Sequence, residues 1–160
     1  MTNNDVLRRI RYTFDLSDTK MIEIFGLAGV TASRAEVSEW LKKDDVPDFV
    51  ECQDSSLAAF LNGYIVLKRG KKDDSEIVNE SKMNNNMILN KLKIALSLQS
   101  LDILDLLSTT DMQLSKHELS AFFRKVDHKN YRICNDQLLR RFLQGLQDKF
   151  KPTAEPFSWE

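Results

Sequence analysis

Apolar residues recur at helical spacing in eight segments of this chain, whereas no segment shows the alternation of Val, Ile or Thr that is typical of strands. Each segment carries a stripe of apolar residues three or four positions apart, which one face of a helix would bury. We therefore predict an all-α protein of about eight helices. The stripes are Val6, Leu7, Ile10 and Phe14; Met21, Ile24, Phe25 and Ala28; Val37, Trp40 and Leu41; Leu57, Phe60, Leu61 and Tyr64; Ile88, Leu89, Leu92 and Leu96; Ile103, Leu106 and Leu107; Leu119, Phe122 and Phe123; and Leu139, Phe142 and Leu143.

The eight segments form two matching sets of four, related by a shift of 82 residues. Residues 52–63 read C-x-D-x-x-L-x-x-F-L-x-G, and residues 134–145 repeat the pattern. Aligned without a gap, residues 1–68 and 83–150 share sixteen identical positions, where chance would give roughly four. The shift exceeds the roughly 20–50 residues of solenoid repeats, so we interpret it as a duplicated domain.

The duplication predicts the domain boundaries. We expect a helical repeat in residues 1–70, a charged linker in 71–82, a second helical repeat in 83–150 and a Pro-containing tail in 151–160. A half of about 70 residues has only a marginal core, so the two four-helix repeats are expected to pack together with pseudo-twofold symmetry. The tail cannot continue a helix because it contains two prolines, and we expect it to be loose.

Polar residues before the apolar stripes predict where helices begin. Ser33-x-x-Glu36 and Ser115-x-x-Glu118 are capping boxes, in which a hydroxyl and a carboxylate each accept a hydrogen bond from a free backbone N–H. Asn and Asp also cap helices well. We expect caps from the pair Asn3 and Asn4, the pair Asn85 and Asn86, and the aspartates Asp54 and Asp136.

Gly63 and its counterpart Gly145 lie inside predicted helices. A glycine there costs up to about 1 kcal/mol relative to alanine, so its presence in both copies predicts a second helix too close for a methyl group. Leucine at either position is expected to lower the melting temperature by several degrees.

Composition places the chain in the globular class, at 42% hydrophobic and 29% charged residues. No window approaches 18 apolar residues, so we expect no membrane span and no membrane partner. Charged residues from Asp5 to Arg11 leave no room for the apolar segment of a signal peptide, and we expect a cytoplasmic protein. In that reducing compartment Cys52 and Cys134 are expected to be free buried thiols.

Charge differs between the two repeats. Residues 1–69 have a net charge of −2 and residues 83–151 a net charge of +4. A positive half is a feature that favours an anionic partner.

Three blocks of sequence are similar to a known family: residues 3–12, residues 60–63 with 68–70, and residues 127–130 ahead of the second Cys-x-Asp block. They read NNDVLRRIRY, FLNG with KRG, and DHKN, and together they resemble the YehS-like bacterial proteins, which are tandem copies of a domain of unknown function. The resemblance covers about residues 2–150. It implies a bacterial intracellular protein with a duplicated domain, and it carries over no catalytic residue.

No motif of a metal site or an enzyme stands out. His128-x5-Cys134 does not have a usual zinc spacing, and the chain has no nucleophile elbow, phosphate-binding loop or dinucleotide fingerprint. We expect no metal, no cofactor and no catalysis. Were there chemistry, residues 127–130 would be the place to look, although turn formation accounts for them better.

These observations favour a non-catalytic helical module that binds an unknown protein partner or associates with itself. The alternative is a nucleic-acid-associated protein that uses basic helix faces, mainly of the second repeat. A helix-turn-helix interpretation of the second and third helices fits poorly, because the expected recognition helix is acidic. The candidate partner surface comprises matched asparagines and cations, expected to be exposed, and the loop of the second repeat: Asn3, Asn4, Arg9, Arg11, Asn85, Asn86, Lys91, Lys93, Asp127, His128, Lys129 and Asn130.

Overall fold

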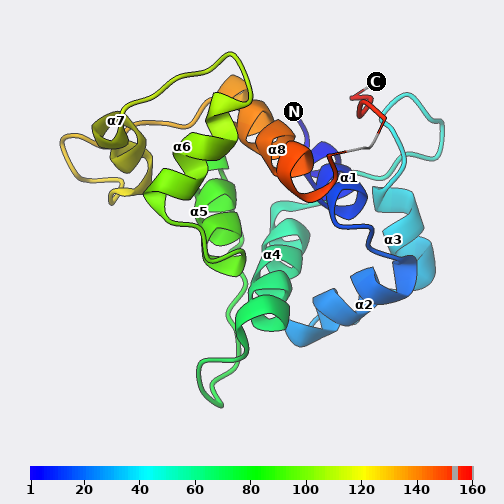
Figure 1. Ribbon diagram of the computed structural model, residues 1–160. Helices are drawn as coiled ribbons and strands as arrows, with labels where there is room; N and C mark the ends of the chain where they lie inside the picture. Colours follow the sequence, from blue (N-terminus) through cyan, green and yellow to red (C-terminus); the bar gives the residue numbers. More distant parts are fainter. Residues whose placement is uncertain (153–154, 160) are drawn as a thin grey trace. The chain divides into compact units, whose positions relative to one another are not determined.

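The computed structural model describes residues 1–152 and 155–159; Thr153, Ala154 and Glu160 of the predicted tail lie outside the described residues. Within the described residues the chain forms α-helices, one short 3-10 helix and no strand. Figure 1 shows the α-helices along the chain. The predicted all-α fold with two sets of four helices is confirmed. The helices are α1 (Asn3–Thr13), α2 (Asp18–Leu27), α3 (Arg34–Trp40), α4 (Asp54–Arg69), α5 (Asn85–Ala95), α6 (Ser100–Ser108), α7 (Lys116–Ser120), the 3-10 helix η1 (Ala121–Phe123) and α8 (Asp136–Phe150).

The chain divides into two units. Unit 1 contains residues 1–83 together with the end of the chain from residue 155, and unit 2 contains the described residues from 84 to 152. In unit 1, α2 packs against α3 and α4, and α1 packs against α4. In unit 2, α6 packs against α7 and α8, and α5 packs against α8. The helices of the two repeats therefore make corresponding contacts.

Each unit buries the apolar stripes that the sequence predicts. Most of these side chains are fully buried, whereas Phe14, Leu41, Leu96 and Phe123 are half-buried. Burial of an apolar side chain stabilises the fold by roughly 1.5–3 kcal/mol, so these stripes supply most of the driving force in each unit.

The two glycines lie where helices approach closely, as predicted. A Cβ on Gly63 would overlap the carbonyl oxygen of Ile24 in α2 and lie 2.8 Å from its carbonyl carbon. A Cβ on Gly145 would lie 2.5 Å from the carbonyl oxygen of Leu106 in α6. The fourth helix of each unit thus packs directly on the backbone of the second helix.

Both predicted capping boxes are confirmed. The Oγ of Ser33 accepts from the backbone N–H of Glu36 at 3.0 Å, and the carboxylate of Glu36 accepts from the N–H of Ser33 at 3.0 Å. Ser115 and Glu118 form the same pair of bonds at the start of α7.

The other predicted caps are wrong. The N-cap of α1 is Thr2 and that of α5 is Asn84, each one residue before the expected asparagine pair. Gln53 precedes α4 and Asn135 caps α8, so the two aspartates lie in the first turn of their helices. The prediction was wrong because the side chains expected to cap these helices form hydrogen bonds with other segments of the chain. They are Asn3, Asn4, Asn85, Asn86, Asp54 and Asp136.

The expectation of a loose tail is also wrong for the described part of the tail. The ring of Phe157 lies 5.4 Å from that of Tyr12 in α1, and the hydroxyl of Tyr12 donates a hydrogen bond to the carbonyl of Glu155 at 2.8 Å. Two aromatic rings and a backbone carbonyl therefore hold the tail on unit 1.

Candidate functional site

One asparagine in α1 closes the connector that joins α3 to α4. The side-chain amide of Asn4 donates to the carbonyl of Trp40 at 3.0 Å and to that of Val50 at 2.9 Å, and its oxygen accepts from the N–H of Cys52 at 2.9 Å. An asparagine amide has two donor hydrogens and an acceptor oxygen, so one side chain serves three backbone groups. Both ends of the connector are thereby held against α1.

The preceding asparagine holds the start of α4. Asn3 donates to the carbonyl of Cys52 at 3.0 Å and to the carboxylate of Asp54 at 2.7 Å, and the other carboxylate oxygen of Asp54 accepts from the N–H of Met83 at 3.0 Å. These hydrogen bonds stabilise the ionised form, and the bond from Asn3 has the largest part in lowering the pKa of Asp54. We call Asn3 and Asn4, with their counterparts in unit 2, the asparagine clamp.

Unit 2 repeats the clamp bond for bond. Asn86 donates to the carbonyls of Phe122 and Arg132 at 3.1 and 2.7 Å and accepts from Cys134, and Asn85 donates to the carbonyl of Cys134 and to the carboxylate of Asp136. Every partner lies 82 residues after its counterpart in unit 1. The duplication therefore preserves side-chain hydrogen bonds as well as sequence.

This geometry corrects the expectation that the matched asparagines and cations are exposed. Asn4 is 1% exposed, Asn86 is 8% exposed, and Arg9 is 1% exposed. Asn3 and Asn85 are half-buried in the clamp. Arg11 is exposed, while Lys91 and Lys93 are half-buried, the latter with its ammonium 5.4 Å from the ring centre of Phe123. Both asparagines of unit 1 are kept in unit 2, and this identity was the sequence signal for their structural role.

The two thiols are free and buried, as predicted. Burial is the main cause that raises the pKa of Cys52 and of Cys134, each to about 12. At pH 8 we expect an aromatic disulfide reagent to label neither thiol in the folded protein and both after unfolding in guanidinium, because the thiolate is the reactive form. Labelling of either thiol in the folded protein at the rate of a free cysteine would contradict the buried geometry.

The connectors differ sharply in charge although they share their backbone turns. Residues 41–53 carry two basic and four acidic side chains, a net charge of −2, whereas residues 123–135 carry four basic and one acidic, a net charge of +3. The N–H of Val46 bonds the carbonyl of Lys43, and that of His128 bonds the carbonyl of Lys125. Most of the charge difference between the repeats thus lies in the connector before the fourth helix. Comparison of the two copies of the sequence reveals this difference.

The predicted loop of unit 2 lies at the surface. Asp127, His128, Lys129 and Asn130 are all exposed. The ring Nδ1 of His128 accepts a hydrogen bond from the N–H of Asn130 at 3.0 Å, which fixes the turn. Among the described residues, no group of three His, Cys, Asp or Glu side chains could hold a metal ion.

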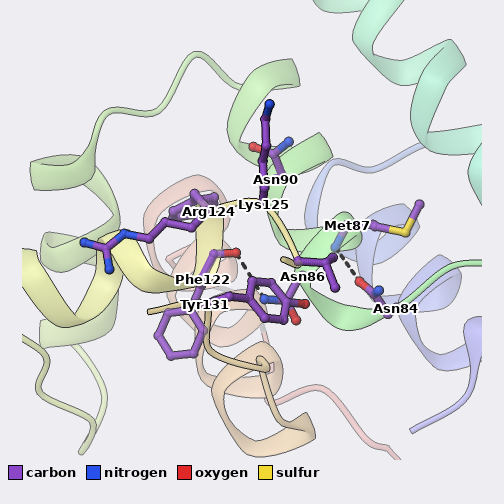
Figure 2. A pocket seen from close by; sticks show the side chains of 10 residues that line it. Asn84, Asn86, Met87, Asn90, Phe122, Arg124, Lys125 and Tyr131 are labelled. Atoms are coloured by element: carbon purple, nitrogen blue, oxygen red, sulfur yellow. Dashed lines mark hydrogen bonds between the residues drawn. The ribbon is translucent and has the colours of Figure 1, made fainter. Parts of the chain in front are cut away.

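A hollow of about 200 Å³ lies between the start of α5 and the connector of unit 2, and Figure 2 shows it from close by. Its wall is rich in apolar and aromatic side chains, with two cations at the connector. In Figure 2 the dashed lines mark the bonds of Asn86 to Phe122 and of Asn84 to Met87, which fix this wall. The lining residues are Asn84, Asn86, Met87, Asn90, Phe122, Phe123, Arg124, Lys125, Val126 and Tyr131.

Two copies of one helical unit, closed by the same hydrogen bonds, define a tandem-repeat helical protein. The chain belongs to the family described as "Protein of unknown function (DUF1456)", whose model matches residues 3–70 and again residues 85–151. It is similar to the "Uncharacterized protein YehS" of Escherichia coli (strain K12), with 42% identity over 147 residues, covering 91% of this chain and 94% of that protein. The resemblance to YehS-like proteins is confirmed. No solved structure matches the chain.

None of the helices in the described part of the chain is long and apolar enough to cross a membrane.

Proposed function

We propose that this protein is a non-catalytic binding module whose second repeat presents its connector to an acidic protein partner. The observation that carries the proposal is the contrast between two connectors with matching turns, one of net charge −2 and the other of net charge +3. The duplication has kept the backbone turns and reversed the charge, and a positively charged surface loop favours association with an anionic surface.

Exposure of the cations supports this proposal. Lys125, Lys129 and Arg132 are exposed, and the guanidinium of Arg132 lies 5.3 Å from the ring centre of Phe122. Stacking on the ring orients the guanidinium at little entropic cost, and Arg enriched beside aromatic residues is typical of binding hot spots. Cations held beside apolar surface suit a protein partner, which offers both acidic and apolar groups.

The absence of catalysis is part of the proposal and rests on the loop of unit 2. A general base must lie within hydrogen-bond reach of the proton that it removes, and it needs a ring nitrogen that can accept that proton. His128 is exposed, and its Nδ1 is engaged by the backbone of Asn130. The arrangement suits a turn better than a catalytic dyad.

Nucleic acid is the second candidate, because the same connector places cations beside the aromatic side chains of Phe123 and Tyr131. Base stacking on aromatic residues combined with phosphate contacts is a common mode of single-strand binding. Filter binding to DNA and RNA at two salt concentrations tests it, since retention by phosphate contacts falls steeply with salt. Absence of salt-sensitive retention would exclude this candidate.

The proposed partner site can be tested by affinity capture from the native host. Lys125→Glu/Lys129→Glu reverses two exposed cations of the connector, and Lys71→Glu/Lys72→Glu makes the same charge change on the exposed linker of unit 1. We expect wild type and the linker variant to retain the same proteins, and the connector variant to lose them by tenfold or more. Equal capture by all three chains would refute the connector as the binding site.

A further inference from the structure

The end of the chain covers a buried arginine of α1. The guanidinium carbon of Arg9 lies 4.6 Å from the ring centre of Phe157 and 4.9 Å from that of Trp159. The two rings meet edge to face at 5.1 Å, a favoured geometry for an aromatic pair. A desolvated guanidinium against two aromatic rings is a specific mode of binding, because the ring faces carry negative charge.

Three further side chains complete this contact. The guanidinium of Arg8 lies 5.6 Å from the ring centre of Phe157, Tyr12 bonds the backbone of the tail, and the ammonium of Lys43 donates to the hydroxyl of Ser158 at 3.5 Å. We call Arg8, Arg9, Tyr12 and Lys43 the tail-binding face of unit 1. It recognises a Phe-x-Trp segment by aromatic contacts, cations and one backbone hydrogen bond.

Unit 2 has four positions that correspond to this face, and two of them keep a cation. The counterparts in unit 2 are Asn90, Lys91, Ile94 and Lys125. Two of them, Asn90 and Lys125, line the hollow, and Ile94 is 42% exposed in α5. The described part of the tail contacts the face of unit 1.

We propose that the hollow of unit 2 binds a short acidic peptide with Phe and Trp two positions apart, supplied by a partner protein. The proposal rests on the proposed function and names the chemistry of the partner. We argue the occupant from the tail, which places a Phe-x-Trp segment on the corresponding positions of unit 1. The tail also carries Glu155 and Glu160 on either side of its aromatic residues.

Size and charge agree with this occupant. An apolar cavity of about 150 Å³ accepts a benzene ring, so a hollow of about 200 Å³ takes one aromatic side chain rather than a drug-sized ligand. Met87, Phe122 and Val126 provide apolar contacts for such a ring, and Lys125 provides a cation for an acidic flank. Val126 is 75% exposed, which leaves apolar surface for a ligand to cover.

The probe is a labelled synthetic peptide, EPFSWE, whose sequence is that of residues 155–160, titrated into the full chain by calorimetry. We expect wild type to bind one peptide. Val126→Asp, in the hollow, is expected to weaken binding at least tenfold. Ile133→Asp is the matched control, because Ile133 is 77% exposed on the same connector and does not line the hollow. The peptide EPASAE, without the rings, is expected not to bind.

A second variant tests the equivalence of the two faces. Phe157→Ala/Trp159→Ala removes the rings that cover the face of unit 1, so this chain is expected to bind two peptides. Binding of one peptide to this variant and none to wild type would restrict the site to unit 1 and overturn the proposal. The proposal would also be overturned if the Val126→Asp variant bound EPFSWE as tightly as wild type does, or if EPASAE bound wild type as tightly as EPFSWE does.

Other occupants give distinct results. One such result is that wild type dimerises and that Phe157→Ala/Trp159→Ala abolishes the dimer. That result would assign the hollow to the tail of a second copy and would overturn the proposal of a separate partner protein. An oligonucleotide that binds where EPFSWE does not would also overturn the proposal. If EPFSWE does not bind wild type while Lys125→Glu/Lys129→Glu still abolishes capture of the partner, the proposed function stands and the proposal of a Phe-x-Trp peptide is overturned.

Discussion

Asn4→Ala is expected to lower the free energy of unfolding by about 3–5 kcal/mol, a large share of the roughly 5–15 kcal/mol that stabilises a domain. The substitution leaves three backbone groups without their partner, the carbonyls of Trp40 and Val50 and the N–H of Cys52. The site is buried, so water replaces the lost bonds poorly. Denaturant unfolding followed by circular dichroism measures the change.

Asn4→Asp separates hydrogen bonding from packing, because it keeps the shape of the side chain. An ionised aspartate can accept from Cys52 but cannot donate to either carbonyl, so we expect a loss at least as large as with alanine. Asn90→Ala is the control, since Asn90 is exposed in α5 and its loss is expected to change stability by less than about 0.5 kcal/mol. A change that small for Asn4→Ala would show that the clamp does not hold the connector.

Gly63→Ala is expected to destabilise unit 1 by about 2 kcal/mol, although alanine is the better helix former. The added Cβ would overlap the carbonyl oxygen of Ile24, which is backbone and cannot turn away as a side chain can. Helix α4 must therefore move off α2. Gly145→Ala is expected to have a smaller effect, because its Cβ would lie 2.5 Å from the carbonyl oxygen of Leu106. Leucine at either position costs more than alanine.

Gly26→Ala is the matched control for these substitutions. Gly26 also lies in a helix, and a Cβ there would meet nothing within 4 Å. It is expected to raise the stability slightly, by up to about 1 kcal/mol, through helix propensity alone. Thermal melts should therefore rank Gly26→Ala above wild type, then Gly145→Ala, then Gly63→Ala. If Gly63→Ala melted at a higher temperature than Gly26→Ala, the close contact between α4 and α2 would be contradicted.

Much of the fold was predictable because its signals are local or repeated. The capping boxes need only Ser33 and Glu36, three residues apart, to satisfy free N–H groups at a helix start. The close approach of helices followed from Gly63 and Gly145, because a costly residue kept in both copies requires a packing reason. Neither inference depends on distant partners.

The candidate site was harder to predict because its partners are distant in sequence. The residues around Asn4 predict that it caps a helix, yet its hydrogen-bond partners are 36 to 48 residues away. Arg9 reads as a solvated charge, yet Phe157 and Trp159 cover it from the far end of the chain. Local pattern carries no information on which segment arrives beside a side chain.

The amino-acid sequence by itself determined the helical class, the duplication, the buried stripes and the charge of each connector, because these depend on periodicity, identity and composition. Only the tertiary structure decided that the asparagines close the connectors, that the described tail lies on α1, and that Asn90 and Lys125 of unit 2 line a hollow. The physical reason is that a polar or cationic side chain has several possible partners of similar energy, and the folded backbone selects one by bringing it within reach.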